Sequence, residues 1–300
     1  MLNIYDYISN NNYCKTFKVN DLMLVEYKCL LAEEPVSYWT HSNYFAYILS
    51  GSTTYQSGDK QYVVKGGDAI FVRKGAYVAT RNGSTDYCAL VIFVPDDFIR
   101  KVTEKYPFVS REGRASDSSA IYPIEMDDCL STYFHSVLSY FPRSIAPVDD
   151  LLKIKFEELL LNIFTGQKNQ SLITCLRGLR DDGKISIREV MESSFMYPMS
   201  LEEYARLCAR SLSAFKADFH EIYNTSPGKW IIRARTEYAR QLLHNTDDSV
   251  NDIAVKSGFK NTAHFVKVFK QAYGAPPLRY RIVKEKEPEL ALAEEFASMD

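Results

Sequence analysis

The segment Phe219-His-Glu-Ile-Tyr223-Asn-Thr-Ser-Pro227-Gly-Lys-Trp230 returns 50 residues later as Phe269-Lys-Gln-Ala-Tyr273-Gly-Ala-Pro-Pro277-Leu-Arg-Tyr280. Upstream the offset is 49 for three further matches: Leu201 with Val250, Ala205 with Ala254, and Ala209 with Gly258. A constant offset with one slip predicts a duplicated unit in which one copy has a longer turn. Two copies are too few for a solenoid, so the repeat predicts one domain with two related halves.

Each copy carries the signals of two short helices joined by a tight turn. The first copy opens at Ser200-Leu-Glu-Glu203, a capping box that favours a helix start, and predicts helices over 201–208 and 211–223. The second copy predicts helices over 250–257 and from Asn261 or Thr262 onward. Two such helices form a helix-turn-helix. Pro227 favours the start of a long connecting helix over 228–244.

Length and charge indicate two domains of different character. The chain has 300 residues, which is long enough for two domains with separate cores. Its net charge of −2 argues against a surface that is basic throughout and binds nucleic acid everywhere. Residues 199–283 nevertheless hold 13 Lys/Arg against 8 Asp/Glu, a net +5 that leaves −7 for the rest. This asymmetry predicts a basic module on a neutral-to-acidic body. The six scattered cysteines lack a CxxC pair, and no apolar run could span a membrane, so we expect a cytoplasmic protein with reduced thiols.

Residues 21–95 have the pattern of short strands separated by turns. Runs rich in Val, Ile, Tyr and Phe alternate with glycine-containing turns that supply positive-φ positions. The predicted strands are Leu22–Leu31, Tyr44–Ser50, Thr53–Gln56, Gln61–Val64, Ala69–Arg73, Ala76–Thr80 and Tyr87–Val94. Strands this short and closely spaced indicate a small sandwich or barrel. Residues 1–20 fit either a loose arm or an edge strand.

Two turns in this region, Leu49-Ser50-Gly51 and Gly66-Gly-Asp-Ala-Ile-Phe-Val72, resemble the cupin-like barrel of bacterial sensor domains. A cupin enzyme would need clustered His and carboxylate ligands for a metal, whereas this region holds one histidine, His41, and no H-x-H motif. We therefore expect no metal, no cofactor and no catalytic residue, and an ordinary surface or core role for His41. A cupin-type metal enzyme with an appended binding module is the alternative function.

Beyond Pro95 the apolar period becomes helical. Residues 127–141 and 148–164 predict two helices, which Pro142 and Pro147 separate. The second helix carries a seam that requires a partner, formed by Leu152, Phe156, Leu159 and Ile163. That partner is either the barrel or a second copy of the chain, and different faces allow both.

Two segments are predicted to lie outside the compact domains. The first is a linker over 167–182, which contains a short helix over 171–179 and leads to Asp181-Asp182-Gly183. The second is an acidic, frayed tail over 283–300. The expected α+β chain thus has a cupin-like sensor or dimerisation domain over 1–166 and an all-helical domain over 183–282.

The second copy carries a more specific signature, with Asp252-Ile-Ala254 upstream of it. It runs Ser257-Gly-Phe-Lys-Asn-Thr-Ala-His-Phe265-Val-Lys-Val-Phe269-Lys-Gln-Ala-Tyr273-Gly-Ala-Pro-Pro277-Leu-Arg-Tyr280-Arg281 and closely resembles that of AraC/XylS-type transcription regulators. The resemblance extends over residues 183–282. The first copy departs from it at Ala209, where the family usually has glycine. We expect alanine to be tolerated there provided that its φ stays negative.

The resemblance implies that both recognition helices, within 211–221 and 261–271, enter successive major grooves on one face of DNA, which lie about 34 Å apart. The residues then expected to approach bases are Ser213, Lys216, Ala217, Thr262, Ala263, His264, Val266 and Lys267. For His264, a capping role is the alternative to base contact. Ser211, Asn261 and the amides at the helix N-termini are better placed for phosphates. A general attraction to phosphate is expected from Arg233, Arg235, Arg240, Lys256, Lys260 and Lys270.

Ile70-Phe-Val-Arg-Lys-Gly-Ala-Tyr-Val78, followed by the helices of 127–164, resembles the type III secretion activator branch of this family. That branch implies self-association through the N-terminal domain, hence a homodimer through 127–164, and control by a regulatory protein. The 21 tyrosines permit a small-molecule effector in a barrel cavity instead. The leading hypothesis is a sequence-specific regulator, expected to be an activator, with double-stranded DNA as its partner and RNA polymerase as a candidate partner.

Overall fold

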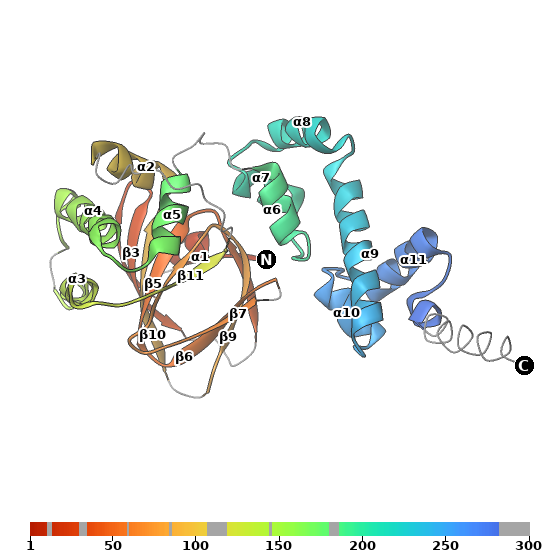
Figure 1. Cartoon of the computed structure of the whole chain (residues 1–300), viewed down its shortest axis with the longest axis horizontal. Helices are drawn as coiled ribbons and strands as arrows, with labels where there is room; N and C mark the ends of the chain where they lie inside the picture. The colour runs from red at the N-terminus through yellow and green to blue at the C-terminus, as the bar shows by residue number, and fades with distance from the viewer. Residues whose placement is uncertain are drawn as a thin grey trace, which may run out of the picture. The chain divides into compact units, whose positions relative to one another are not determined.

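The computed structural model describes residues 1–10, 14–29, 35–58, 60–83, 86–106, 119–143, 146–179 and 186–281. The chain divides into two compact units, Met1–Ile185 and Ser186–Asp300 (Figure 1). The first unit is rich in strands and the second is helical, so the predicted α+β organisation is confirmed. The predicted boundary at 181–183 and the acidic tail lie outside the described residues.

Two sheets form the frame of the N-terminal unit. In spatial order, the five-stranded sheet contains β1 (Leu2–Asn3), β4 (Val36–Thr40), β9 (Gly75–Arg81), β6 (Ser52–Ser57) and β7 (Lys60–Lys65). The six-stranded sheet contains β11 (Ile121–Ile124), β8 (Ala69–Val72), β5 (Asn43–Ser50), β10 (Tyr87–Val94), β3 (Leu22–Cys29) and β2 (Lys15–Val19). All described strand pairs are antiparallel except β1 with β4.

The six-stranded sheet is buried on both faces, which explains its almost continuously apolar strands. One face meets the other sheet in a core that includes Tyr44, Ile48 and Phe93. The opposite face is covered by four helices, α2 (Asp96–Lys105), α3 (Asp128–Leu138), α4 (Asp149–Thr165) and α5 (Gln170–Gly178). Alternate side chains of β10 therefore enter two different cores, and both sets must be apolar.

All seven predicted strands are confirmed, but the sequence missed several shorter elements. Helix α1 (Ile4–Asn10) and strands β1 and β2 replace the expected loose arm or single edge strand. Strand β11 was not predicted because Pro123 argues against a strand. The edge position of β11 in the six-stranded sheet tolerates this proline. Helix α2 had a usable signal, since Asp96 and Asp97 lie at its N-terminus directly after Pro95.

The predicted seam of α4 is buried inside the monomer. Its residues are at most 2% exposed and belong to the core between the helices and the six-stranded sheet: Leu152, Phe156, Leu159 and Ile163. This seam therefore packs against the barrel, as one of the two alternatives expected. The predicted linker also needs correction, because α5 inserts Leu172 and Leu176 into the same core. Helix α5 belongs to the N-terminal unit, and the division falls after residue 185.

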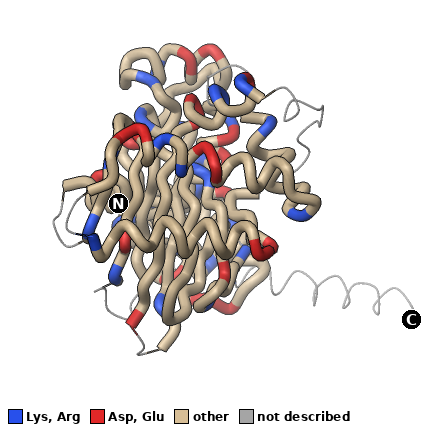
Figure 2. The backbone as a smooth tube through the Cα atoms, turned by 90° about the vertical axis from the view of Figure 1, so that its left-hand side faces the viewer, with Lys and Arg blue, Asp and Glu red and all other residues tan. Residues whose placement is uncertain are grey.

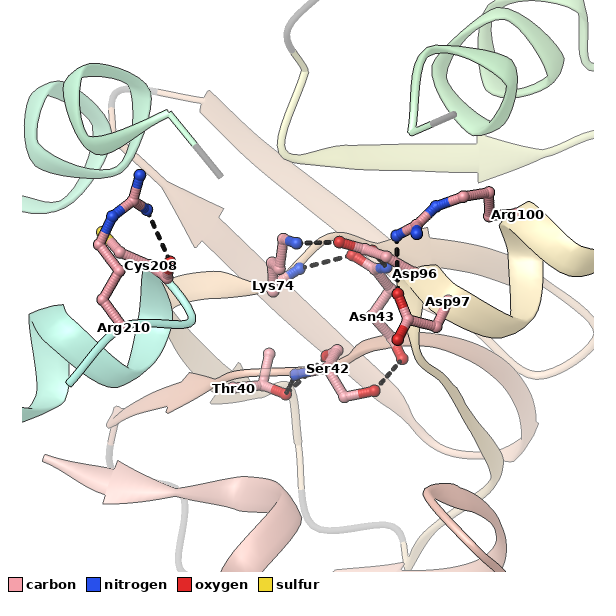
Figure 3. A network of polar contacts seen from close by, with 9 residues as sticks. All are labelled: Thr40, Ser42, Asn43, Lys74, Asp96, Asp97, Arg100, Cys208 and Arg210. Carbon is pink, nitrogen blue, oxygen red and sulfur yellow. Dashed lines mark hydrogen bonds and ion pairs between the residues drawn. The ribbon is translucent and has the colours of Figure 1, made fainter. Parts of the chain in front are cut away.

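A buried polar network fixes the start of α2 to the turns of the barrel (Figure 3). The Asn43 side chain is fully buried, donates to Asp96 Oδ1 at 2.5 Å and accepts from the Lys74 backbone amide at 2.9 Å. The Lys74 ammonium forms an ion pair with Asp96. Asn43 thus bonds two neighbouring elements at once, and its loss would remove one hydrogen bond from each.

Asn43→Ala should lower the free energy of unfolding of the N-terminal unit by about 2–3 kcal/mol, because two partly buried groups lose a partner. Hydrogen exchange of the β5, β8 and β10 amides in the full chain measures this loss. The control Asp97→Asn removes only a surface ion pair with Arg100, since Asp97 is 74% exposed, and should change stability by less than about 0.5 kcal/mol. Equal losses in the two variants would contradict the role given to Asn43.

Candidate nucleic-acid interface

The described part of the C-terminal unit, residues 186–281, contains six helices in chain order. They are α6 (Ile187–Ser194), α7 (Leu201–Leu207), α8 (Leu212–Tyr223), α9 (Pro227–Asn245), α10 (Val250–Lys256) and α11 (Thr262–Tyr273). Helices α7 and α8 form the first helix-turn-helix, and α10 and α11 the second. Four residues separate the first pair and five the second, so the predicted extra turn residue of the second copy is confirmed.

The aromatic rings behind the two recognition helices, α8 and α11, pack in matching arrangements. The matched distances between ring centroids are 4.6 Å for Phe219–Tyr223 and 4.7 Å for Phe269–Tyr273, then 6.1 Å for Phe219–Trp230 and 5.4 Å for Phe269–Tyr280. Phe219 and Phe269 are fully buried. The repeat in the sequence is therefore a repeat of packing. The sequence predicts a core role for Phe219, Phe269, Tyr223, Tyr273 and Trp230, and the first two are fully buried, whereas the other three are partly buried.

The turns of the two units differ at one residue. Both follow the same hydrogen-bond pattern, in which the Arg210 amide donates to Ala205 and the Phe259 amide to Ala254, each at 2.9 Å. This pattern requires a left-handed residue after the helix. Gly258 has φ +87°, and Ala209 has φ +54°. The condition that Ala209 keep a negative φ is therefore wrong, and its methyl group is accommodated with some backbone strain.

The expected base-contacting residues lie on the sides of α8 and α11 away from the aromatic core. Ser213, Lys216 and Ala217 are exposed at helical spacing on α8, and Phe215 and Phe219 are buried opposite them. On α11 the exposed residues are Ala263, His264 and Lys267, with Thr262 and Val266 partly buried beside them. The structure thus gathers each predicted set on one helix face.

The two residues expected near phosphate are the N-caps of the recognition helices. The Ser211 hydroxyl accepts from the Ala214 amide at 3.2 Å, and Asn261 Oδ1 accepts from the His264 amide at 3.1 Å. Asn261, not Thr262, is therefore the cap of α11. The His264 ring instead lies edge-on to Phe259, with centroids 6.0 Å apart. His264 thus has no capping role in α11.

Three of the cations expected to attract phosphate already form ion pairs or hydrogen bonds with other groups of the protein. The Arg240 guanidinium pairs with Glu237 and the Lys256 ammonium with Asp248, contacts that lower the pKa of each carboxyl group. Arg235 binds backbone carbonyls inside the unit. Within the described residues, Lys216 and Lys267 form no ion pair, in contrast to these three. Lysines, arginines and acids are interspersed along the backbone (Figure 2), so these local pairings decide which cations are available.

Arg210, at the turn of the first unit, neutralises an acidic group on the recognition helix. Its Nε donates to Asp218 of α8 at 2.7 Å. Figure 3 shows its second contact, in which Nη1 donates to the Cys208 carbonyl at 2.8 Å. The pair reduces the repulsion that the Asp218 carboxylate would exert on a DNA backbone. Sequence spacing gave no sign of this contact.

The N-terminal unit contains a pocket between its two sheets. About 720 Å³ within it, the open mouth included, is free of protein atoms. Its lining is Leu2, Ile4, Ile8, Tyr27, Val36, Tyr38, Tyr44, Thr53, Tyr55, Ala79, Arg81, Tyr87, Val91 and Phe93. Two pairs of hydroxyl groups hydrogen-bond in this region, Tyr38 with Tyr44 at 2.6 Å and Tyr55 with Tyr87 at 3.2 Å. Burial raises the pKa of Tyr38, Tyr44 and Tyr87 well above the usual value.

His41 has a packing role beside this pocket. Its Nδ1 lies 3.2 Å from the Asn3 side-chain amide, and its ring contacts Tyr5 with centroids 4.8 Å apart. Over the described ranges, no group of three or more His, Cys, Asp or Glu side chains is arranged to hold a metal ion. None of the helices that the structure describes is long and apolar enough to cross a membrane.

Two helix-turn-helix units with exposed recognition faces define a DNA-binding domain of a transcription regulator. A model of helix-turn-helix domains matches residues 204–282, and one of the ExsA N-terminal regulatory domain matches residues 43–175. The thermoregulatory protein LcrF of Yersinia pestis is 30% identical over 250 residues, which cover 81% of this chain and 91% of LcrF. The chain therefore belongs to the AraC-type transcription regulators that carry an ExsA-type N-terminal regulatory domain.

Two further similarities concern a relative and a solved structure. The virulence regulon transcriptional activator VirF of Yersinia enterocolitica is 28% identical over 248 residues, which cover 81% of this chain and 91% of VirF. An apo variant of ToxT from Vibrio cholerae is 13% identical and has a TM-score of 0.42, with 88% of this chain and 98% of ToxT covered. The relatives by sequence are regulators of transcription, which gives the alternative of a cupin-type enzyme no support.

Ala209→Gly should raise the free energy of unfolding of the C-terminal unit by about 0.5–1 kcal/mol, because glycine adopts the left-handed conformation without strain. Urea unfolding of the full chain, followed by hydrogen exchange of the α7 and α8 amides, measures the change. A loss of stability would contradict it and would show that the exposed Ala209 methyl group makes a compensating contact.

Proposed function

We propose that this regulator activates transcription by placing α8 and α11 in two successive major grooves on one face of duplex DNA. The observation that carries the proposal is the matched aromatic packing, in which equivalent rings hold each recognition helix and leave the equivalent side of each exposed. The naming of VirF as a transcriptional activator supports activation rather than repression. Contact with RNA polymerase belongs to this proposal.

The exposed faces suggest how bases are read. Lys216 and Lys267 carry ammonium groups outside any described ion pair, and such groups donate to guanine O6 and N7. The hydroxyl groups of Thr262 and Ser213 can bond either a donor or an acceptor on a base edge. Ala217, Ala263 and Val266 offer apolar contact to thymine methyl groups. His264 is assigned to base contact, because Asn261 already caps its helix.

Phosphate contacts are assigned to the helix N-termini and to cations outside the described ion pairs. Ser211 and Asn261 bring the first-turn amides of α8 and α11 to the DNA-facing end, where these amides favour an anion. Arg233, Lys260 and Lys270 are exposed and complete this set. Arg235 is excluded from it because its guanidinium is bound inside the unit.

Lys267→Ala tests the proposed base contact. If Lys267 reads guanine, its loss should cost about 1–3 kcal/mol at one base pair and relax the preference there. A loss that is uniform over all sequences, with the salt slope reduced by about one, would assign Lys267 to phosphate instead. Affinity is measured for duplexes enriched by the full chain from a randomised pool, with single base pairs then replaced in turn.

The matched control for this measurement is Lys101→Ala, because Lys101 is exposed on α2 of the N-terminal unit. It removes the same charge from the chain and should leave affinity and base preference unchanged. Unchanged binding by the Lys267 variant as well would remove α11 from the proposed interface.

For the N-terminal domain we propose a small-molecule effector in the pocket between the sheets. Its mainly apolar and aromatic lining is typical of ligand sites, and Arg81 provides a positive charge at the wall. A regulatory protein as the controlling partner is the second candidate. A homodimer through α3 and α4 would have to use their solvent side, where Ile154 is 58% exposed, because the α4 seam is buried. In each case the chain acts by binding, without catalysis.

Ala79→Leu tests the effector proposal by filling the pocket. The aromatic anion anilinonaphthalene sulfonate serves as the probe, since it combines an apolar body with one negative charge. We expect saturable binding to the full chain at one site, weakened at least about tenfold by the added side chain. Binding that the substitution leaves unchanged would place the probe elsewhere and favour control by a protein partner.

A further inference from the structure

The connection between α6 and α7 is held by side chains from α9 and from α7 itself. Arg235 of α9 donates from Nε to the Phe195 carbonyl and from Nη2 to the Tyr197 carbonyl, both at 2.7 Å. The Tyr204 hydroxyl of α7 donates to the Ser194 carbonyl at 2.9 Å. The Ser194 and Tyr197 carbonyls also accept from the backbone amides of Tyr197 and Met199, so the side chains add second donors there, and Arg235 binds the Phe195 carbonyl as well.

The environment of Arg235 shows that it is a structural cation and not a surface one. Burial lowers the pKa of its guanidinium and raises the pKa of the neighbouring Tyr204 to about 12. Arginine nevertheless stays charged in proteins, so its hydrogen bonds to carbonyl groups are charge-assisted. Its two contacts span about 40 positions of sequence, from α9 back to the end of α6.

The turn of the second helix-turn-helix reaches the same connection. A Cβ atom on Gly258 would lie 2.3 Å from the Met196 carbonyl oxygen and 2.9 Å from Arg235 Nε. No rotamer change could relieve a contact this close to a backbone atom. The equivalent turn of the first unit carries Ala209, which is exposed. The difference between the two copies therefore marks the place where the second unit packs against the α6–α7 connection.

We propose that this junction, residues 194–199 with Arg235 and Gly258, fixes the angle and spacing of α8 relative to α11. Helix α9 is the covalent connection between the two helix-turn-helix units. A second contact between these units is needed to prevent rotation of one relative to the other about the α9 axis. Arg235 and Gly258 provide that contact and are positioning residues for a DNA site that occupies two grooves. The inference rests on the proposed placement of both recognition helices in successive grooves.

The experiment compares binding to whole and divided sites. The probes are duplexes of about 30 base pairs that the wild-type full chain enriches from a randomised pool, long enough for half-sites one turn apart. Derivatives carry one to five inserted base pairs between the half-sites, or only one intact half-site. Wild type should lose affinity steeply on insertion, because rigidly linked sites bind together with a gain of about 10²–10⁴.

Arg235→Met and Gly258→Ala should each bind the intact site at least about tenfold more weakly and become insensitive to insertion. They should bind a single half-site as wild type does, and Arg235→Met should keep the wild-type salt slope, because no phosphate contact is lost. Arg235→Lys keeps the charge but cannot hold both carbonyls in the same fork, so its effect should be intermediate. Ala209→Gly, the matched change in the other turn, should keep the wild-type spacing preference.

Two results would overturn the inference: half-site and whole-site affinities that fall together, or a spacing preference that survives in all three junction variants. Circular dichroism shows whether each variant is folded, and the lysine variant provides the test if the other two are not. A wild-type chain that tolerates insertions would instead refute binding in two successive grooves, so the two failures are distinguishable.

Discussion

The packing of aromatic rings against the back of each recognition helix is the constraint on which DNA binding depends. A helix of 12 residues, the length of α8 and of α11, is marginal alone in water. Phe219 and Phe269 are fully buried and give each helix a fixed orientation, which leaves the opposite face free to be polar. Burial of one side thus makes a stable, exposed recognition surface possible on the other.

The duplicated domain was predictable because its signals are local. Apolar residues at helical spacing and Ser and Asn caps are all set within a few residues of sequence. The strain at Ala209 and the role of Arg235 were not predictable in this way. The first depends on the hydrogen-bond pattern that the turn adopts, and the second on carbonyl groups 38 and 40 positions away. A basic residue on an amphipathic helix looks the same in sequence whether it faces DNA or a carbonyl.

In the N-terminal unit, local sequence signals located the longer strands but not the packing partners of the helices and strands. Turn glycines and β-branched runs located the seven longer strands, but β11 pairs at a sheet edge despite Pro123, so its strand signal is weak. The α4 seam was visible, yet a seam alone does not identify its partner. Only the tertiary structure shows that Phe156 and Leu159 meet the sheet rather than a second chain. The candidate pocket likewise joins strands from both sheets, and composition could indicate no more than an excess of tyrosine.

The pairing of tyrosine hydroxyls limits how that pocket can recognise an effector. In the pairs Tyr38 with Tyr44 and Tyr55 with Tyr87, one hydroxyl donates to the other, so at most one O–H of each pair remains to donate to a ligand. A sugar-like ligand with several hydroxyl groups would therefore find few donors in the pocket, and each hydrogen bond it formed would replace one with water, with little net gain. Apolar and aromatic groups need no such donors, because they replace only contacts with water. The lining therefore favours an effector with an apolar body over a sugar-like one.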